Sequence, residues 1–140
     1  MSSIQHSLRI PKKLDREISR EIQFRGERDW SKGEISLMEE ALRSSRVPGI
    51  VFVQGRNERR PAVAFSGLEV REVVATWKES GETWDELIKA YPEVSENQLR
   101  AARAYYSTYP EEIDERPARE AYWTPERVAE ERPFTRRPGA

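Results

Sequence analysis

Side chains that could catalyse a reaction are few in this chain of 140 residues. There is no cysteine, and His6 is the only histidine, so thiolate zinc sites and His-based catalytic triads have almost no basis. The densest acidic cluster is Glu111, Glu112, Asp114 and Glu115, whose carboxylates are of the type that binds magnesium or transfers protons. It lies in a Pro-flanked segment without a second motif, and solvation of a helix end explains it better. We therefore expect no enzymatic activity, no metal site and no cofactor.

A different chemistry is indicated by polar side chains near the N-terminus. Gln5, Ser7 and Arg9 occupy alternate positions over residues 4–10, opposite in parity to the apolar side chains. This period of two predicts a β-strand, which Pro11 ends. The single histidine falls on the apolar side of the strand, where a packing or edge role is expected.

This strand has no partner nearby, because the next predicted elements are helices. A lone strand is not stable, and the economical partner is the same strand of a second copy, paired antiparallel about a two-fold axis. Leu8 and Ile10 then face the helices, while the polar side chains face outward as a two-stranded ribbon. Such a ribbon fits the major groove of DNA, where glutamine suits adenine and arginine suits guanine. We expect a homodimer that binds DNA.

Two amphipathic helices must position this ribbon. One is predicted over 12–25, with Gly26 just past its end, and the other over 32–45. Ser31 and Glu34 match a capping box at the start of the second helix. The apolar positions that mark the helices are Leu14, Ile18 and Ile22 in the first and Ile35, Met38 and Leu42 in the second.

This order of strand, helix and helix resembles the ribbon-helix-helix family of repressors and antitoxins over about residues 4–46. The resemblance rests on Gln-His-Ser-Leu-Arg-Ile-Pro, on the helix from Lys12 and on the Ser-Lys-Gly-Glu-Ile that opens the second helix. It implies that the outward strand residues read bases and that free amides at the start of the second helix clamp a phosphate. The residues in these places are Gln5, Ser7 and Arg9 for the bases and Ser31, Lys32 and Gly33 for the phosphate.

A second unit is predicted over residues 47–115. Two short apolar runs, 50–53 and 62–65, predict a β-hairpin. Three further capping boxes each precede a helical pattern, which predicts a compact three-helix unit over 66–109. The boxes pair Ser66 with Glu69, Thr83 with Glu86, and Ser95 with Gln98.

This unit resembles the family called domain of unknown function 433, found in antitoxins beside nuclease-like toxin genes. The main carriers are Val-Pro-Gly-Ile (47–50), Arg-Pro-Ala-Val (60–63), Trp-Asp-Glu-Leu (84–87) and Leu-Arg-Ala-Ala-Arg-Ala-Tyr-Tyr (99–106). The resemblance implies a helix-turn-helix with residues 96–109 in the place of the recognition helix. Taken with the N-terminal unit, it makes the chain look like an antitoxin of the VapB type.

The helix at 96–109 has two interpretations. Its polar side chains could contact DNA, yet residues 71–115 carry eleven acidic against five basic residues, a net −6 that repels phosphate. The arginines then pair with nearby glutamates, as Arg100 would with Glu96, and the unit is a dimerising or toxin-docking scaffold. The side chains concerned are Asn97, Gln98, Arg100 and Arg103.

The last segment, 116–140, is predicted to bind a toxin. The resemblance implies a PIN-like ribonuclease, whose magnesium-binding carboxylates a guanidinium would pair with. Aromatic side chains would anchor the segment. The candidate toxin-binding residues are Tyr122, Trp123, Arg127, Arg132, Phe134, Arg136 and Arg137.

The expected architecture is mainly α-helical. It comprises a ribbon-helix-helix domain over 1–46, a helix-turn-helix-like domain over 47–115 and an extended tail over 116–140. The chain has neither a signal-peptide pattern nor an apolar run near the roughly 20 residues of a membrane helix, so a cytoplasmic location is expected. The predicted function is that of an antitoxin of a type II system, which neutralises its toxin and represses its own operon. The alternative is a stand-alone ribbon-helix-helix transcriptional regulator without a toxin.

Overall fold

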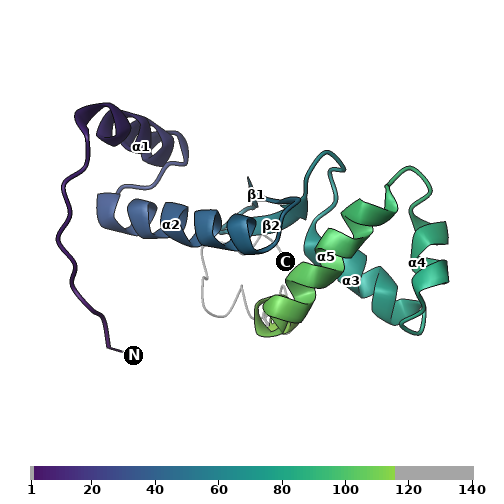
Figure 1. Cartoon of the computed structure of the whole chain (residues 1–140). Coiled ribbons are helices and arrows are strands. Elements are labelled where there is room, and N and C mark those ends of the chain that lie inside the picture. Colours follow the sequence, from purple (N-terminus) through teal and green to yellow (C-terminus); the bar gives the residue numbers. More distant parts are fainter. Residues whose placement is uncertain (1, 116–140) are drawn as a thin grey trace, which may run out of the picture.

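Two helices follow the N-terminal segment in the computed structural model, which describes residues 2–115 (Figure 1). Helix α1 spans Lys12–Phe24 and helix α2 spans Trp30–Arg46, so both predicted helices are confirmed. Residues 2–10 precede them without forming a helix or a strand. A single chain offers no second copy for this segment to pair with, and the two-stranded ribbon stays a prediction.

Helix α1 ends at a glycine, as predicted. Gly26 has a φ of +75°, its N–H donates to the carbonyl of Gln23, and the N–H of Glu27 donates to the carbonyl of Ile22. These two bonds form a Schellman motif. Glycine adopts the left-handed conformation that the motif needs without a steric penalty, so the chain turns here and leads into α2.

Helix α2 begins earlier than predicted, because Asp29 rather than Ser31 caps it. The carboxylate of Asp29 accepts a hydrogen bond from the N–H of Lys32 at 3.2 Å. An acidic side chain is favourable there because it meets both the free amides and the positive end of the helix dipole. The predicted capping box from Ser31 is therefore wrong.

A β-hairpin follows α2. Strands β1 (Ile50–Gln54) and β2 (Arg59–Val63) pair antiparallel, with Ile50 opposite Val63. The second strand was predicted over 62–65 and begins three residues earlier. The reason is the tight turn, closed where the N–H of Gly55 donates to the carbonyl of Glu58 at 2.7 Å, which brings the polar side chains that follow into the ladder.

Three helices complete the described chain: α3 (Val70–Glu79), α4 (Trp84–Ala90) and α5 (Glu96–Thr108), with residues 110–115 also helical. The capping box of Ser95 with Gln98 is confirmed at α5. At α4, Thr83 occupies the cap position without a side-chain bond.

The capping box predicted from Ser66 is wrong. Glu69 caps α3 and pairs with Glu72, whose carboxylate accepts the Glu69 N–H at 3.0 Å. Ser66 is engaged instead in the preceding turn, where its hydroxyl donates to the carbonyl of Val63 and accepts the N–H of Leu68.

The hydrophobic core lies between α3, α4, α5 and the hairpin. Fully buried Leu87 and Leu99 each contribute on the order of 1.5–3 kcal/mol by leaving water. Tyr105 is also fully buried and packs edge-on against Phe52 of β1. The buried residues of this cluster are Val47, Ile50, Val63, Val70, Val73, Val74, Leu87, Leu99, Ala102, Tyr105 and Ile113.

The elements form two ends joined by the hairpin (Figure 1). Helices α1 and α2 lie at one end with the N-terminal segment, and α3, α4 and α5 lie at the other. The described part of the chain is thus mainly helical with one two-stranded antiparallel sheet. None of its helices has the length and apolar character needed to span a membrane.

Candidate nucleic-acid interface

The predicted base-reading side chains are accessible. Gln5, Ser7 and Arg9 are exposed and form no hydrogen bond or ion pair with any residue in the described range. Residues 4–10 also pair with neither strand of the hairpin, since the sheet consists of β1 and β2 alone within residues 2–115. The backbone donors and acceptors of this segment are therefore open to a partner.

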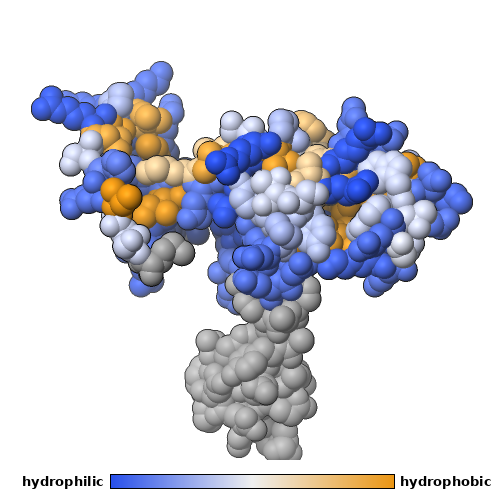
Figure 2. Space-filling view, turned by 60° about the horizontal axis from the view of Figure 1, so that its bottom comes forward, coloured by the Kyte–Doolittle hydropathy of each residue, from blue (hydrophilic) through white to orange (hydrophobic). Residues whose placement is uncertain are grey.

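An apolar stripe lies open on α2. Ile35, Met38 and Leu42 are each more than half exposed, and Leu14 of α1 and Leu8 of the N-terminal segment are exposed as well. Figure 2 shows orange, hydrophobic side chains gathered over the end of the molecule that α1 and α2 form. Three large apolar side chains on one helix face would normally be buried, so this face is suited to contact with another chain.

The predicted phosphate clamp has a different geometry from that expected. Asp29 engages two of its three amides, because its carboxylate accepts the N–H of Lys32 and its carbonyl accepts the N–H of Gly33 at 3.0 Å. A phosphate at this helix end would compete with the Asp29 carboxylate for the N–H of Lys32. Gly33 itself is buried against α1, where a Cβ would lie 2.7 Å from two carbons of Ile22.

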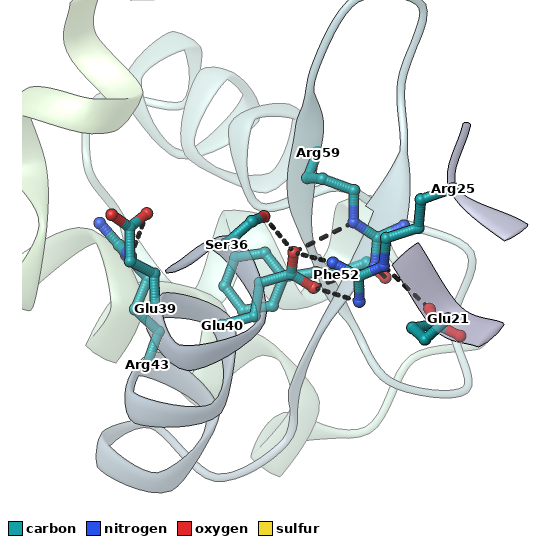
Figure 3. Close-up of polar contacts among 8 residues, drawn as sticks. All are labelled: Glu21, Arg25, Ser36, Glu39, Glu40, Arg43, Phe52 and Arg59. Atoms are coloured by element: carbon teal, nitrogen blue, oxygen red, sulfur yellow. Dashed lines mark hydrogen bonds and ion pairs between the residues drawn. The ribbon is translucent and has the colours of Figure 1, made fainter. Parts of the chain in front are cut away.

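A nearly buried carboxylate joins α1, α2 and β2 (Figure 3). Glu40 accepts a bond from Arg25 at 2.7 Å and bonds from Arg59 at 2.9 and 3.1 Å. The hydroxyl of Ser36 donates to it at 3.2 Å, and Glu21 binds the other side of Arg25 at 2.8 Å. This cluster, which we call the Glu40 network, fixes the hairpin against α2.

The charge state of Glu40 follows from this arrangement. Burial alone would raise the pKa of its carboxyl, but the guanidiniums of Arg59 and Arg25 outweigh burial, and the pKa lies below its ordinary value. Burial also opposes the charge of Arg25, yet the two carboxylates beside it raise its pKa further. Both shifts favour the charged forms, so the pair of Glu40 and Arg25 is ionised at neutral pH.

The polar side chains at the start of α5 serve the domain's own structure. Gln98 accepts the N–H of Ser95 and donates to the carbonyl of Ala64 at 2.8 Å, which ties α5 to the end of the hairpin. Arg100 pairs with Glu96 at 2.9 Å, as the spacing predicted. Asn97 is exposed in the first turn of the helix.

Arg103 lies on two tryptophan rings. Its guanidinium carbon is 4.3 Å from the ring centroid of Trp77 and 5.0 Å from that of Trp84, and the two rings meet edge-on. Such cation–π contacts stabilise the packing of α3, α4 and α5. The cations that a recognition helix would direct at DNA are thus held by this domain's own side chains.

The acidic segment after α5 also has structural partners. Glu112 accepts the hydroxyl of Tyr105 at 2.7 Å and binds Arg43 of α2 at 3.2 Å, and burial raises the pKa of the Tyr105 phenol well above its ordinary value. Asp114 binds Lys78 at 3.0 Å and accepts the hydroxyl of Tyr106 at 2.8 Å. Within residues 2–115 no three acidic or histidine side chains gather as metal ligands.

The predicted toxin-binding residues fall beyond the part of the chain that the structure describes. They are Tyr122, Trp123, Arg127, Arg132, Phe134, Arg136 and Arg137.

Comparison with known protein families found one match, which covers part of the chain. Residues 50–106 match the model of a family described as a protein of unknown function (DUF433). The match covers the hairpin, α3, α4 and most of α5, so this part of the chain is a DUF433 domain. Helices α1 and α2 lie outside it. No curated protein and no solved structure matched the chain.

Proposed function

We propose that the protein is a homodimeric antitoxin that binds the operator DNA of its own operon and neutralises a ribonuclease toxin by direct contact. The observation that carries the proposal is the open apolar stripe of α2 beside an N-terminal segment that pairs with no strand within residues 2–115. Both features fit one occupant, a second copy of the same chain.

Dimerisation would resolve both features at once. Pairing residues 4–10 with their copy about a two-fold axis satisfies the backbone groups of both segments. The same contact would cover Ile35, Met38 and Leu42, each worth about 1.5–3 kcal/mol when fully buried. The result is the intertwined ribbon-helix-helix arrangement.

DNA binding would follow from the dimer. The ribbon presents Gln5, Ser7 and Arg9 on its outer face, with a width that suits the major groove. Residues 1–46 carry a net +2, whereas residues 71–115 carry −6, which favours the N-terminal end as the surface that meets phosphate. The engagement of Arg100 and Arg103 by Glu96 and the tryptophans supports the same choice.

The toxin-binding part of the proposal rests on the DUF433 domain and on the resemblance of the chain to antitoxins. A domain with its own core, in which Lys78 pairs with Asp114 and Arg100 with Glu96, suits a scaffold better than an enzyme. The partner would be a PIN-like nuclease, with residues 116–140 reaching its acidic site.

Substitution of Arg9 tests the DNA contact. Arg9→Ala removes a side chain that suits bidentate pairing with guanine, so we expect specific binding to weaken by about 1–3 kcal/mol. The measurement is a gel-shift titration on the DNA upstream of the protein's own gene. Arg100→Ala, which loses the same charge on α5, serves as the control and should bind as the wild type does. Equal affinity of Arg9→Ala and the wild type would exclude the ribbon as the reading surface.

Co-purification tests the toxin. The protein would be expressed with a nuclease encoded by a neighbouring gene, and the complex isolated through a tag on the nuclease. We expect the full chain to be retained and a chain lacking residues 117–140 to be lost. If the tagged nuclease retains neither the full chain nor the shortened one, the stand-alone regulator is favoured instead.

A further inference from the structure

The tip of the hairpin presents an exposed arginine, Arg56. The turn is closed by the bond from the Gly55 N–H to the carbonyl of Glu58, which leaves Arg56 and Asn57 exposed at its tip. Arg56 forms no hydrogen bond, ion pair or ring contact with another residue between positions 2 and 115. A cation of this kind is available to a ligand.

This tip lies beside the end of α2 that the proposed function places on DNA. A cavity of about 270 Å³ is shared by the hairpin turn, the loop after α1 and the first turns of α2. Arg56 and Asn57 line it from the hairpin, while Gly26, Gly33 and Ser36 line it from the helices. The tip and the start of α2 thus form one continuous surface.

The Glu40 network fixes the position of the tip. Arg59, three residues after Arg56, is held to α2 by two bonds to Glu40 and also donates to the carbonyl of Phe52 at 3.1 Å. Glu40 lies opposite Ile35, Met38 and Leu42 in the 3.6-residue period of the helix, so the hairpin is attached to the side of α2 away from the apolar stripe.

The charges around the cavity single out Arg56. Arg25 and Arg59 also line it, but both are bonded to Glu40, and Arg25 is bonded to Glu21 as well. Two carboxylates, Glu27 and Glu58, lie there as well. Arg56 is thus the cation of this surface that is left to bind an anion, and the neighbouring Asn57 amide is a second donor suited to a phosphate oxygen.

We propose that Arg56 and Asn57 bind the phosphate backbone of the DNA duplex that the N-terminal ribbon reads. The inference rests on the proposed function and extends it, because it gives the DUF433 domain a part in DNA binding through its hairpin rather than through α5. A phosphate contact of this kind fixes the orientation of the protein on the duplex without reading sequence.

A salt titration tests the contact. Affinities of the full-length protein for a labelled duplex from upstream of its gene, and for a duplex of scrambled sequence, would be measured by fluorescence anisotropy at several salt concentrations. We expect Arg56→Gln to reduce the slope of log K against log salt by about 0.9 per lost phosphate contact, or roughly 2 for a dimer. The loss of affinity should be the same factor on both duplexes.

Arg100→Gln is the matched control, because it removes the same charge from the α5 surface and should leave the slope unchanged. Thermal unfolding of both variants would confirm that they are folded. If Arg56→Gln keeps the wild-type slope while Arg9→Ala weakens specific binding, the hairpin contact is overturned and the proposed function stands. If the wild-type protein binds neither duplex, both proposals fall.

Discussion

One carboxylate, that of Glu40, holds both the end of α1 and the second strand of the hairpin to α2. Its side chain is 13% exposed, and those of Arg25 and Arg59 are 11% and 24% exposed. Charges at this depth are tolerated because each has a bonded counter-charge, and removing the shared carboxylate would leave Arg59 without its counter-charge and Arg25 with Glu21 alone. Glu40 is therefore the polar residue on which the join between helices and hairpin depends most.

Substituting this residue should destabilise the fold. Glu40→Gln keeps the size of the side chain but removes the charge, and we expect the free energy of unfolding to fall by about 1.5–3 kcal/mol. Urea denaturation followed by circular dichroism measures it. The control is Glu39→Gln on the same helix turn, where the side chain is 60% exposed and its ion pair is 3.6 Å long, so the change should stay below about 1 kcal/mol. Equal effects would contradict the role given to Glu40.

The same carboxylate predicts a pH dependence. The pKa of Glu40 is lower in the folded protein than its ordinary value of 4.5, so its stabilising contribution is complete above that value. The contribution is lost as the pH falls from about 4.5 through the lower folded pKa. Between these pH values the stability of the wild type should fall more steeply than that of Glu40→Gln. Parallel curves in the two proteins would contradict this assignment.

At the scale of elements, the sequence predicts helices well and their first residues less well. Periodic apolar positions locate α1, α2 and α5 to within about two residues, because each helix must bury or present one face. The caps were misplaced at Asp29 and Glu69, where an acidic side chain close to the expected serine satisfies the same free amides. Sequence spacing alone does not show which of two nearby polar residues caps a helix, because this depends on the conformation of the preceding loop.

Contacts between side chains of different elements could not be predicted from the sequence. Glu40 and Arg59 are 19 positions apart, with a hairpin turn between them, and no periodic pattern relates them. The placement of Arg103 on Trp77 and Trp84 likewise needs the fold of three helices. The alternation of Gln5, Ser7 and Arg9 with apolar side chains is a local property of the sequence, but residues 2–10 form no strand in the single chain, so the outward face stays a prediction.

Helix–helix packing gives a prediction at Gly33. A Cβ at this position would lie 2.7 Å from Cγ1 and Cγ2 of Ile22, so in Gly33→Ala either the Ile22 side chain or α1 must shift. We expect a loss of about 1–3 kcal/mol from overpacking, which exceeds the gain of up to about 1 kcal/mol from alanine's helix propensity. The double variant Ile22→Ala/Gly33→Ala should lose less than the sum of the two single variants. Additive losses in urea denaturation would show that the two residues do not compete for space.

At the scale of the whole molecule, the two ends are built differently. The DUF433 end has a continuous buried core, whereas α1 buries Ile22 alone and α2 buries only Gly33. The apolar side chains that would form a core at the N-terminal end are present but exposed. This difference is the reason to expect a second copy at that end rather than at the other.

Charge on the apolar stripe should therefore prevent dimerisation. Leu42→Lys places a cation in the contact proposed for α2, and we expect the protein to sediment as a monomer at micromolar concentration while the wild type sediments as a dimer. Phe65→Lys is the control, because Phe65 is fully exposed beyond the hairpin and outside the proposed contact. Analytical ultracentrifugation distinguishes the states. A dimeric Leu42→Lys protein would require a different interface.

Because α1 and α2 bury few side chains, the stability of the N-terminal end should depend on the concentration of the protein. The dimerisation proposed above would stabilise the N-terminal end with the logarithm of protomer concentration, whereas the core of the DUF433 end is formed within one chain. In a cell that is degrading this protein, the N-terminal half would thus loosen first, as copies become scarce and cannot find one another. Under the proposed function, the operon would then be released while folded DUF433 domains remain.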